Sequence, residues 1–404
     1  MRTILVGLLL LSGCGMSARE DFPGFPGGTG GDGSGPGPGA GSGLQPGQLT
    51  AGDYDDNKNF ERMQSSLDQV FAPLVDKGSL PVAERIIATV TDGARRPLSD
   101  ARLAITSGGA VLVSLPTGSD GRVLLFPTLD VFAGRSDLGV TISTAAGTRS
   151  FPIPTGTTWT FAVPDATAAL PTALDLAFVV DATGSMGDEL EYLKTEMRDI
   201  TQRIAAQSPG VSLRYALIVY RDQGDPYVVR SFPFDSLASF EANLGQQSAD
   251  GGGDYPEAAE LAMTAALELG WRSGNVARVL FHVADAPPHD DKYAPFLAAA
   301  KAAHARGIRI FPVGASGVGL AAEYLMRLSA FVTLGRYIFL TDDSGIGNPH
   351  EPPHIPCYQV QHLNDLLVRE VTSELAGSYL AAPPADILHT VGNYDNGVCR
   401  DAGA

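Results

Sequence analysis

Carboxylate and hydroxyl side chains gather in one short segment of the 404-residue chain. The run Asp181-Ala182-Thr183-Gly184-Ser185 follows an apolar stretch, 174–180, and places one carboxylate and two hydroxyls within five residues. Hard divalent cations such as Mg²⁺ prefer oxygen ligands of this kind. The segment is therefore a candidate for metal binding.

Two further acidic residues stand at comparable positions. Asp254 lies in the run Gly-Gly-Gly-Asp-Tyr-Pro-Glu at 251–257, directly before a predicted helix, and Asp285 follows the apolar run 276–284. Carboxyl ends of parallel strands meet at one edge of a sheet, and sites of such folds lie there. We expect Asp181, Asp254 and Asp285 to come together at that edge.

The elements that must position these residues alternate between two periods. Apolar runs of strand length are separated by segments in which apolar residues recur every three or four positions, as in amphipathic helices. Strand, helix, strand is the unit of a parallel sheet. The strands are expected at 174–180, 213–220, 276–284, 308–313 and 337–340, with an edge strand at 227–232. The fold class is therefore α/β, a doubly wound, mostly parallel, Rossmann-like sheet.

The segment around Asp181 resembles the von Willebrand factor A (VWA) domain, in which Asp-x-Thr/Ser-Gly-Ser after an apolar strand opens the metal ion-dependent adhesion site. The resemblance places the domain at 172–383. It implies that one divalent cation binds at five residues, Asp181, Thr183, Ser185, Asp254 and Asp285. Mg²⁺ is the expected ion, with Ca²⁺ and Mn²⁺ as alternatives, and the implied function is binding of a protein partner rather than catalysis.

Asp254 departs from the usual pattern of that family, which has a threonine at this position. A third carboxylate is expected to hold the cation more tightly and to reduce its need for an acidic ligand from the partner. The alternative is that the carboxylates cap helices and bind no metal. Asp222 and Asp225 lie in a turn at the same edge of the predicted sheet. They could form the rim of the metal site, or they could simply be solvated residues of the turn, and the two interpretations are equally good.

The histidines give only weak evidence for catalysis. The run His-Glu-Pro-Pro-His at 350–354 matches a zinc protease pattern, but its two prolines forbid the helix on which that pattern depends. His282 and His289 flank Asp285, and an ordinary buried or surface histidine is the preferred interpretation of each. The chain is not expected to be an enzyme. The 350–354 run is the one feature that would support a hydrolase activity.

The N-terminus resembles that of a bacterial lipoprotein. An apolar run at 4–11 is too short to span a bilayer, and it ends in Leu-Ser-Gly-Cys at 11–14, similar to a lipobox whose Cys14 carries the lipid. Residues 1–14 are thus expected to be the signal segment. Gly15, instead of aspartate, implies the outer membrane, so the lipid anchor would be the only contact with a membrane.

The next segments are interpreted from composition and period. Residues 15–52 form an expected flexible linker, since 21–48 hold 12 Gly and 5 Pro. An amphipathic helix is expected at 53–78. Short β runs at 79–166 predict a small all-β sandwich preceding the α/β domain, resembling the immunoglobulin-like, carboxypeptidase regulatory-like modules and interpreted as a spacer.

The remaining cysteines lie near the C-terminus. If Cys14 carries lipid, Cys357 and Cys399 remain as an even pair in an oxidising compartment. A disulfide that pins the 384–404 tail is the resulting hypothesis.

The overall charge limits the class of partner. The chain has 28 basic and 45 acidic residues, a net charge of −17, which disfavours nucleic acid because that partner needs a basic surface. We expect a metal-dependent protein-binding lipoprotein of adhesion or scaffold type. The alternative is a structural or assembly subunit of a cell-envelope complex, in which the metal only stabilises the fold.

Overall fold

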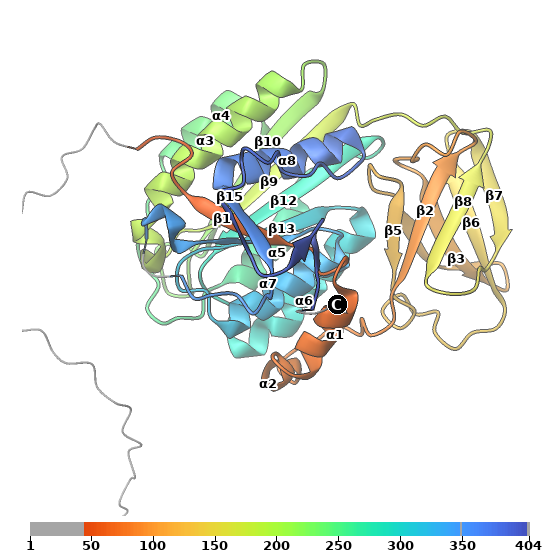
Figure 1. Cartoon of the computed structure of the whole chain (residues 1–404), viewed down its shortest axis with the longest axis horizontal. Helices are drawn as coiled ribbons and strands as arrows, with labels where there is room; N and C mark the ends of the chain where they lie inside the picture. Colours follow the sequence, from red (N-terminus) through yellow and green to blue (C-terminus); the bar gives the residue numbers. More distant parts are fainter. Residues whose placement is uncertain (1–43, 348–349, 402–404) are drawn as a thin grey trace, which may run out of the picture. The chain divides into compact units, whose positions relative to one another are not determined.

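The computed structural model describes residues 44–347 and 350–401, and these form one compact unit. Its largest element is a nine-stranded sheet in the order β11-β10-β9-β12-β13-β14-β1-β15-β16, with helices on both faces (Figure 1). The strands of this sheet are β1 (Thr50–Tyr54), β9 (Ala173–Asp181), β10 (Ser212–Tyr220), β11 (Val229–Asp235), β12 (Val276–Ala284), β13 (Arg309–Gly314), β14 (Tyr337–Leu340), β15 (Tyr358–His362) and β16 (His389–Val391). The helices are α1 (Phe60–Asp68), α2 (Ala72–Val75), α3 (Leu190–Gln207), α4 (Leu237–Gly245), α5 (Ala259–Glu268), α6 (Tyr293–Arg306), α7 (Leu320–Val332) and α8 (Leu363–Ala376).

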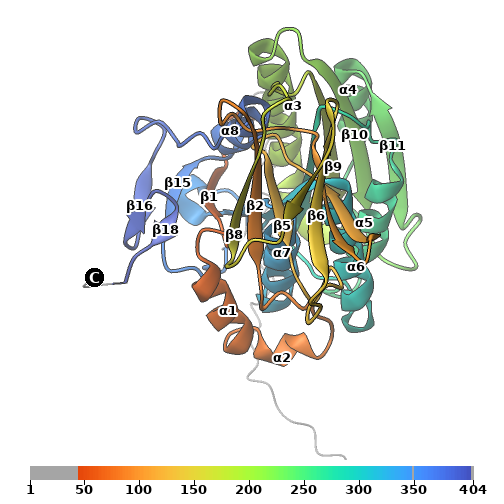
Figure 2. The same cartoon turned by 90° about the vertical axis from the view of Figure 1, so that its right-hand side faces the viewer.

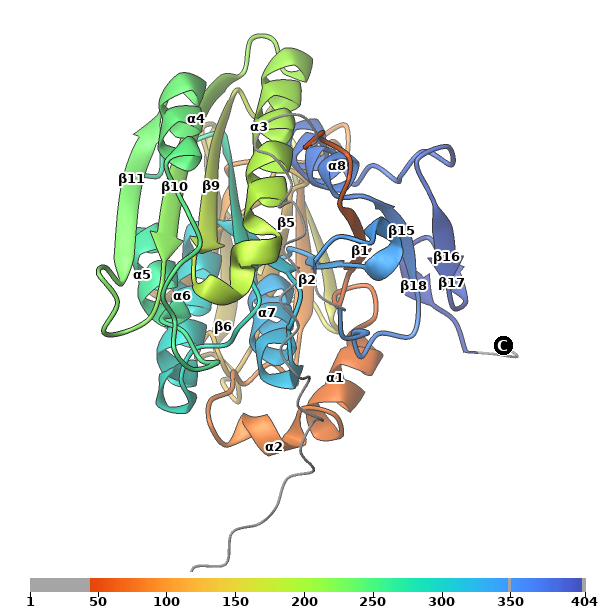
Figure 3. The same cartoon turned by 90° about the vertical axis from the view of Figure 1, so that its left-hand side faces the viewer.

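Five neighbouring strands of this sheet are parallel to one another: β10, β9, β12, β13 and β14. Antiparallel strands extend this parallel core on both sides. The predicted fold class is confirmed: a doubly wound sheet with a parallel core, accompanied by small β-sheets. Figure 3 shows the sheet from the side on which α3 and α4 lie near β9 and β10.

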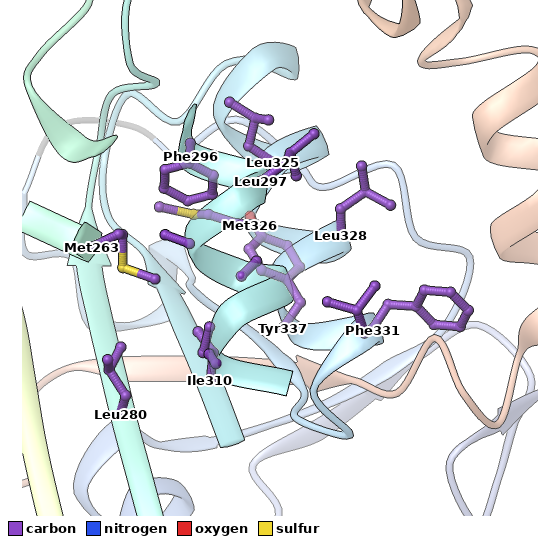
Figure 4. Close-up of a cluster of buried hydrophobic side chains, with 14 of the residues drawn as sticks. Met263, Leu280, Phe296, Leu297, Ile310, Leu325, Met326, Leu328, Phe331 and Tyr337 are labelled. Atoms are coloured by element: carbon purple, nitrogen blue, oxygen red, sulfur yellow. The ribbon is translucent and has the colours of Figure 1, made fainter. Parts of the chain in front are cut away.

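The two faces of the sheet carry two separate cores because successive side chains of a strand point to opposite faces. In β9, Leu176 and Phe178 pack under α3, α4 and α8, whereas Ala177 and Val179 face α5, α6 and α7. Figure 4 shows the core on the α5, α6 and α7 side, where Met263 of α5 and Phe296 of α6 lie over the sheet. All nine residues of β9 are buried, so the strand that ends at Asp181 is held from both sides.

The β-sandwich consists of one three-stranded sheet, β5-β2-β8, and one four-stranded sheet, β4-β3-β6-β7 (Figure 2). Side chains such as Val90, Leu103 and Trp159 form its own buried core. The strands are β2 (Ile86–Asp92), β3 (Arg102–Ser107), β4 (Ala110–Pro116), β5 (Arg122–Leu125), β6 (Leu138–Thr144), β7 (Gly147–Pro152) and β8 (Thr158–Val163).

The segment before the sandwich differs from expectation. Thr50–Tyr54, assigned to the linker and to the start of a helix, form β1 between β14 and β15, and all five residues are buried. A Cβ at Gly52 would come within 2.7 Å of the Phe339 ring, so the absence of a side chain permits the strand. The expected 53–78 helix is two helices, because Pro73 stands in the first turn of α2 and cannot continue a preceding helix.

The C-terminal tail is also ordered by contacts. His389–Val391 pair with β15, and a short hairpin of β17 (Tyr394–Asp395) and β18 (Val398–Cys399) follows. Cys399 forms a disulfide with Cys357, the pair considered from the sequence, with a Cα–Cα distance of 5.5 Å. Cys14 lies outside the described residues. Within residues 44–347 and 350–401, no helix combines the length and the apolar character needed to cross a bilayer.

Candidate metal centre

The first segment of the predicted site is a hydrogen-bonded loop at the end of β9. Asp181 Oδ1 accepts hydrogen bonds from the backbone N–H of Thr183 at 2.9 Å and from its hydroxyl at 2.7 Å. The Thr183 hydroxyl lies 3.1 Å from that of Ser185. Asp181 and Thr183 are fully buried, whereas Ser185 is exposed. The three predicted oxygen ligands thus form one group that reaches from the interior to the surface.

Asp285 lies beside Asp181, at the end of the neighbouring strand β12. Burial raises the pKa of Asp181 to about 7, and the charge of Asp285 adds to this increase. Asp285 itself is 3% exposed. The second oxygen of Asp181, Oδ2, is buried and has no donor with hydrogen-bonding geometry among the described residues. Two buried carboxylates in one place provide the charge that a divalent cation requires.

Glu257 is a third carboxylate at this position, which the sequence analysis did not select. Its side chain is buried at 2% exposure, and burial together with Asp181, Asp222 and other carboxylates raises its pKa to about 9. Its Oε2 has no hydrogen-bond partner within the described part of the chain. Glu257 closes the Gly-Gly-Gly-Asp-Tyr-Pro-Glu run, and that position was the signal that could have identified it.

Asp254, one of the five predicted ligands, has two further possible ligands beside it. Among the described residues, one set of three acidic or histidine side chains offers ligand atoms within 4.8 Å of one another: Asp222, Asp254 and His289. His289 Nε2 is 3.1 Å from Asp222 Oδ1 and 3.2 Å from Oδ2. Asp222 is buried, His289 is partly exposed and Asp254 is exposed. Asp222, for which the sequence left a rim of the site and a solvated turn open, and His289, interpreted as an ordinary histidine, therefore form a group with Asp254.

Backbone hydrogen bonds hold the loops of this region together. Gly184 N–H donates to Gly251 O at 3.1 Å, which joins the loop after β9 to the glycine run. Asp225 Oδ2 accepts from the N–H groups of Asp222 at 3.1 Å and Gly252 at 2.9 Å. Gly251 has a φ of +78°, and a Cβ there would lie 2.3 Å from Asp225. The glycines thus allow two loops to meet at one carboxylate.

Other histidines have separate partners. His282 is buried, its Nε2 lies 3.2 Å from the Tyr220 hydroxyl, and burial lowers its pKa to about 4. In the 350–354 run, His350 lies 2.9 Å from Glu189, while His354 lies 2.8 Å from Glu323. The two imidazoles of that run therefore pair with different carboxylates, one directly before α3 and one on α7, and they do not share one ligand set.

Comparisons with known proteins identify the type of domain to which these loops belong. The family profile described as von Willebrand factor A domain matches residues 175–311, which include most of β9, the glycine run and Asp285. The chain contains a VWA domain. Over 126 residues it is 31% identical to the alpha-protein kinase vwkA of Dictyostelium discoideum, covering 30% of this chain and 19% of that protein. It is 35% identical over 119 residues to mouse (Mus musculus) von Willebrand factor A domain-containing protein 7, covering 29% and 12%.

The chain spans less than a fifth of the length of these two curated relatives. A solved structure of the conserved hypothetical protein BatB from Bacteroides thetaiotaomicron is 14% identical, with a TM-score of 0.36 over 50% of this chain and 98% of that one. The VWA domain here carries a group of two aspartates and one histidine that is able to hold a metal ion.

Proposed function

We propose that the chain binds a protein partner through a divalent cation held at the end of the VWA sheet by Asp181, Thr183, Ser185, Asp254 and Asp285. The two buried carboxylates of Asp181 and Asp285, at the ends of neighbouring strands, support this proposal most directly. Carboxylate and hydroxyl oxygens are the donors preferred by Mg²⁺. When bound, the ion supplies positive charge to which an oxygen of the partner can coordinate.

The exposure of the site supports binding from outside. Ser185 is exposed while Asp181 and Asp285 are buried, so a cation held by these residues would face solvent on the Ser185 side. Glu257 places a third carboxylate next to the pair, as its raised pKa indicates. More negative charge around the ion favours tight metal binding and lowers its attraction for an acidic group of the partner.

A second candidate function is structural. The buried carboxylates Asp181, Glu257 and Asp285 repel one another, so a cation among them would also stabilise the fold. In that case the chain would serve as an assembly subunit of an envelope complex and contact its neighbours through another surface.

One experiment distinguishes the two functions. The full chain is used to capture partners from an envelope extract, with and without EDTA, and in parallel as the Asp285→Asn variant. Metal-dependent binding predicts that EDTA and the variant both abolish capture. A structural role predicts that the same partners remain bound while the melting temperature falls. Asp137→Asn, an exposed sandwich variant, is the matched control.

The location of the protein is part of the proposal. Cys14 and the lipobox-like run would anchor the chain by lipid in the bacterial outer membrane, as the only membrane contact. Labelling cells with radioactive palmitate tests this, because the full chain should incorporate label and the Cys14→Ala variant should not. We propose no catalytic activity and no nucleic-acid partner, given the net charge of −17.

A further inference from the structure

We propose that a cavity between the β-sandwich and the VWA domain binds a small organic molecule that carries a phosphate group. The cavity has a volume of about 550 Å³, which is typical of sites for small ligands. The sandwich contributes Asp100, Arg102 and Pro116 to its wall, and the VWA domain contributes Arg278, Arg306 and their neighbours. The proposed metal-dependent function does not involve this cavity.

The cavity lies at the opposite end of the sheet from the metal centre. Residues 269–274, which line it, directly precede β12, whereas Asp285 directly follows that strand. The strand has nine residues, and a rise of roughly 3.3 Å for each residue places its two ends about 30 Å apart. A small ligand in the cavity therefore does not reach a cation held at Asp181.

Four arginines line the cavity: Arg102, Arg272, Arg278 and Arg306. Arg272 is neutralised by an ion pair of 2.7 Å with Asp175. The other three arginines form no ion pair with any carboxylate of the described residues, although the chain carries a net charge of −17. A group of unpaired arginines in so acidic a chain points to an anionic ligand.

These three guanidinium groups keep N–H groups available for a ligand. Arg102 donates with Nε and Nη2 to Ser114. Arg278 donates with Nε and Nη2 to backbone carbonyls of the 272–274 turn, and Arg306 donates with Nη1 to a backbone carbonyl of α5. The Nη1 groups of Arg102 and Arg278 and the Nη2 group of Arg306 have no acceptor in the described part of the chain. The hydrogen bonds that are made hold the side chains in place for the ligand.

The charge and geometry of these groups favour phosphate over carboxylate. Asp100 is the one carboxylate among the described residues that line the cavity, so three arginines against one aspartate leave an excess of two positive charges. Burial lowers the pKa of Arg278, and the charges of Asp100 and Asp175 oppose this only in part. A phosphate monoester carries about two negative charges at neutral pH and has three terminal oxygens. Guanidinium groups from several directions can share these oxygens, whereas a carboxylate offers two oxygens in one plane.

The remaining wall is apolar. Pro116, Leu269 and Trp271 contribute to it. Trp271 is fixed by a hydrogen bond of 2.7 Å from Nε1 to Ala266 O, and its ring meets the Phe234 ring edge-on at a centroid distance of 4.8 Å. An apolar wall beside charged donors suits an organic phosphate better than inorganic phosphate alone.

The ordinary alternative is that the arginines only brace the loops that carry them. The hydrogen bonds of Arg102 to Ser114 and of Arg278 to the 272–274 turn would serve that purpose. Such bracing uses two N–H groups of each guanidinium and leaves the other donors idle. It also gives no reason for three like charges around one cavity, since like charges repel one another.

The test is a calorimetric titration of the full chain with phenyl phosphate. The chain is first freed of metal on a chelating resin, so that no cation at Asp181 can bind the probe. We expect one phenyl phosphate to bind per chain, and phthalate, an aromatic dicarboxylate of the same charge, to bind more weakly. Arg102→Gln and Arg306→Gln should each weaken phenyl phosphate binding by about tenfold, because each removes a charge-assisted hydrogen bond.

The matched control is Arg135→Gln, since Arg135 is an exposed arginine of the sandwich outside the cavity. Its affinity for phenyl phosphate should stay within about twofold of that of the unchanged chain, because distant exposed charges are screened by salt. Arg102→Gln should retain the increase in melting temperature that Mg²⁺ causes, so this proposal and the metal-dependent function fail separately.

A vesicle experiment identifies the source of the phosphate group. Phosphatidylcholine vesicles containing phosphatidic acid are sedimented with the unchanged chain and with Arg102→Gln. Co-sedimentation that the variant loses would assign the cavity to a lipid headgroup. Phenyl phosphate binding without co-sedimentation would assign it to a soluble phosphate.

Four results would overturn the proposal. Phenyl phosphate fails to bind, or phthalate binds equally well and removes the preference for phosphate. An equal loss in Arg102→Gln and Arg135→Gln would indicate general electrostatic attraction, and an unchanged affinity in both Arg102→Gln and Arg306→Gln would place the probe elsewhere. If Arg306→Gln does not fold by circular dichroism, Arg102→Gln, at an exposed position on β3, decides alone.

Discussion

Arg309 Nη2 donates a hydrogen bond of 2.7 Å to Asp120 Oδ1, which joins the first residue of β13 to the β-sandwich. Its Nη1 donates to Glu374 of α8 at 2.5 Å. Burial alone would raise the pKa of Asp120, but Arg309 and Arg122 outweigh that effect and hold it below the ordinary value. The sandwich and the VWA domain are therefore connected by a buried, charged contact.

Replacement of Arg309 by methionine should destabilise the chain by about 3–5 kcal/mol, because Asp120 and Glu374 would remain buried without their cation. Urea unfolding monitored by circular dichroism measures this loss. Arg149→Ala removes an exposed ion pair with Asp165 in the sandwich and should cost less than about 1 kcal/mol. Equal losses in the two variants would contradict the importance of the buried contact.

Stability without metal should fall as the pH rises. The pKa of Glu257 is about 9 in the folded chain against an ordinary value of 4.5, so between these values the folded state holds a proton that the unfolded state has released. Folding is then increasingly disfavoured from about pH 4.5 to about pH 9. Glu257→Gln should flatten this dependence and stabilise the EDTA-treated chain at pH 8 by at least about 1.4 kcal/mol, the value of one pKa unit.

The control for the Glu257 experiment is Glu268→Gln, at an exposed position on α5. Its pH dependence should match that of the unchanged chain. If both variants show the same slope in thermal unfolding between pH 5 and pH 9, the Glu257 carboxyl does not carry the proton responsible.

Addition of Mg²⁺ should raise the melting temperature of the EDTA-treated chain. A ligand at 100 times its dissociation constant stabilises the folded state by about 2.7 kcal/mol. Asp181→Asn removes a buried ligand oxygen and should abolish the increase, whereas Asp137→Asn should retain it. Differential scanning calorimetry with and without MgCl₂ measures both, and an equal response in the two variants would exclude Asp181 as a ligand.

Removal of the disulfide should destabilise the C-terminal segment. The bond between Cys357 and Cys399 closes a loop with a sequence separation of 42, for which the chain-entropy relation gives about 4 kcal/mol. The double variant Cys357→Ser/Cys399→Ser should lose about that amount in urea unfolding. Reduction with dithiothreitol should have the same effect on the unchanged chain and none on the variant.

The sequence predicted the parallel core because its strands are long apolar runs that alternate with amphipathic helices. It did not predict β1, since the Thr50–Tyr54 segment is short, contains Gly52 and follows a glycine-rich stretch. Its strand character comes from partners that lie about 280–310 residues later in the chain. Local periodicity contains no information about such pairing.

Similar reasoning applies to the candidate site. Asp181, Thr183 and Ser185 are neighbours in the sequence and were found by their spacing. Glu257 and His289 approach the other carboxylates only when three separate loops meet. The position of Glu257 at the end of the glycine run was a usable signal, whereas nothing in the spacing marked His289. The hydrogen bonds of Asp225 to two loops were equally invisible in the sequence.

The position of β1 determines which part of the protein a force applied at the N-terminal side would load first. Glu196 of α3 accepts the N–H groups of Gly47, Gln48 and Leu49, and β1 follows directly, hydrogen-bonded between β14 and β15. Tension applied at Leu44 would therefore shear β1 against its two antiparallel neighbours inside the VWA sheet. The sandwich lies later in the chain than β1, so this force would reach the VWA sheet without passing through the sandwich. The sandwich therefore does not act as a spacer between an N-terminal anchor and the metal centre.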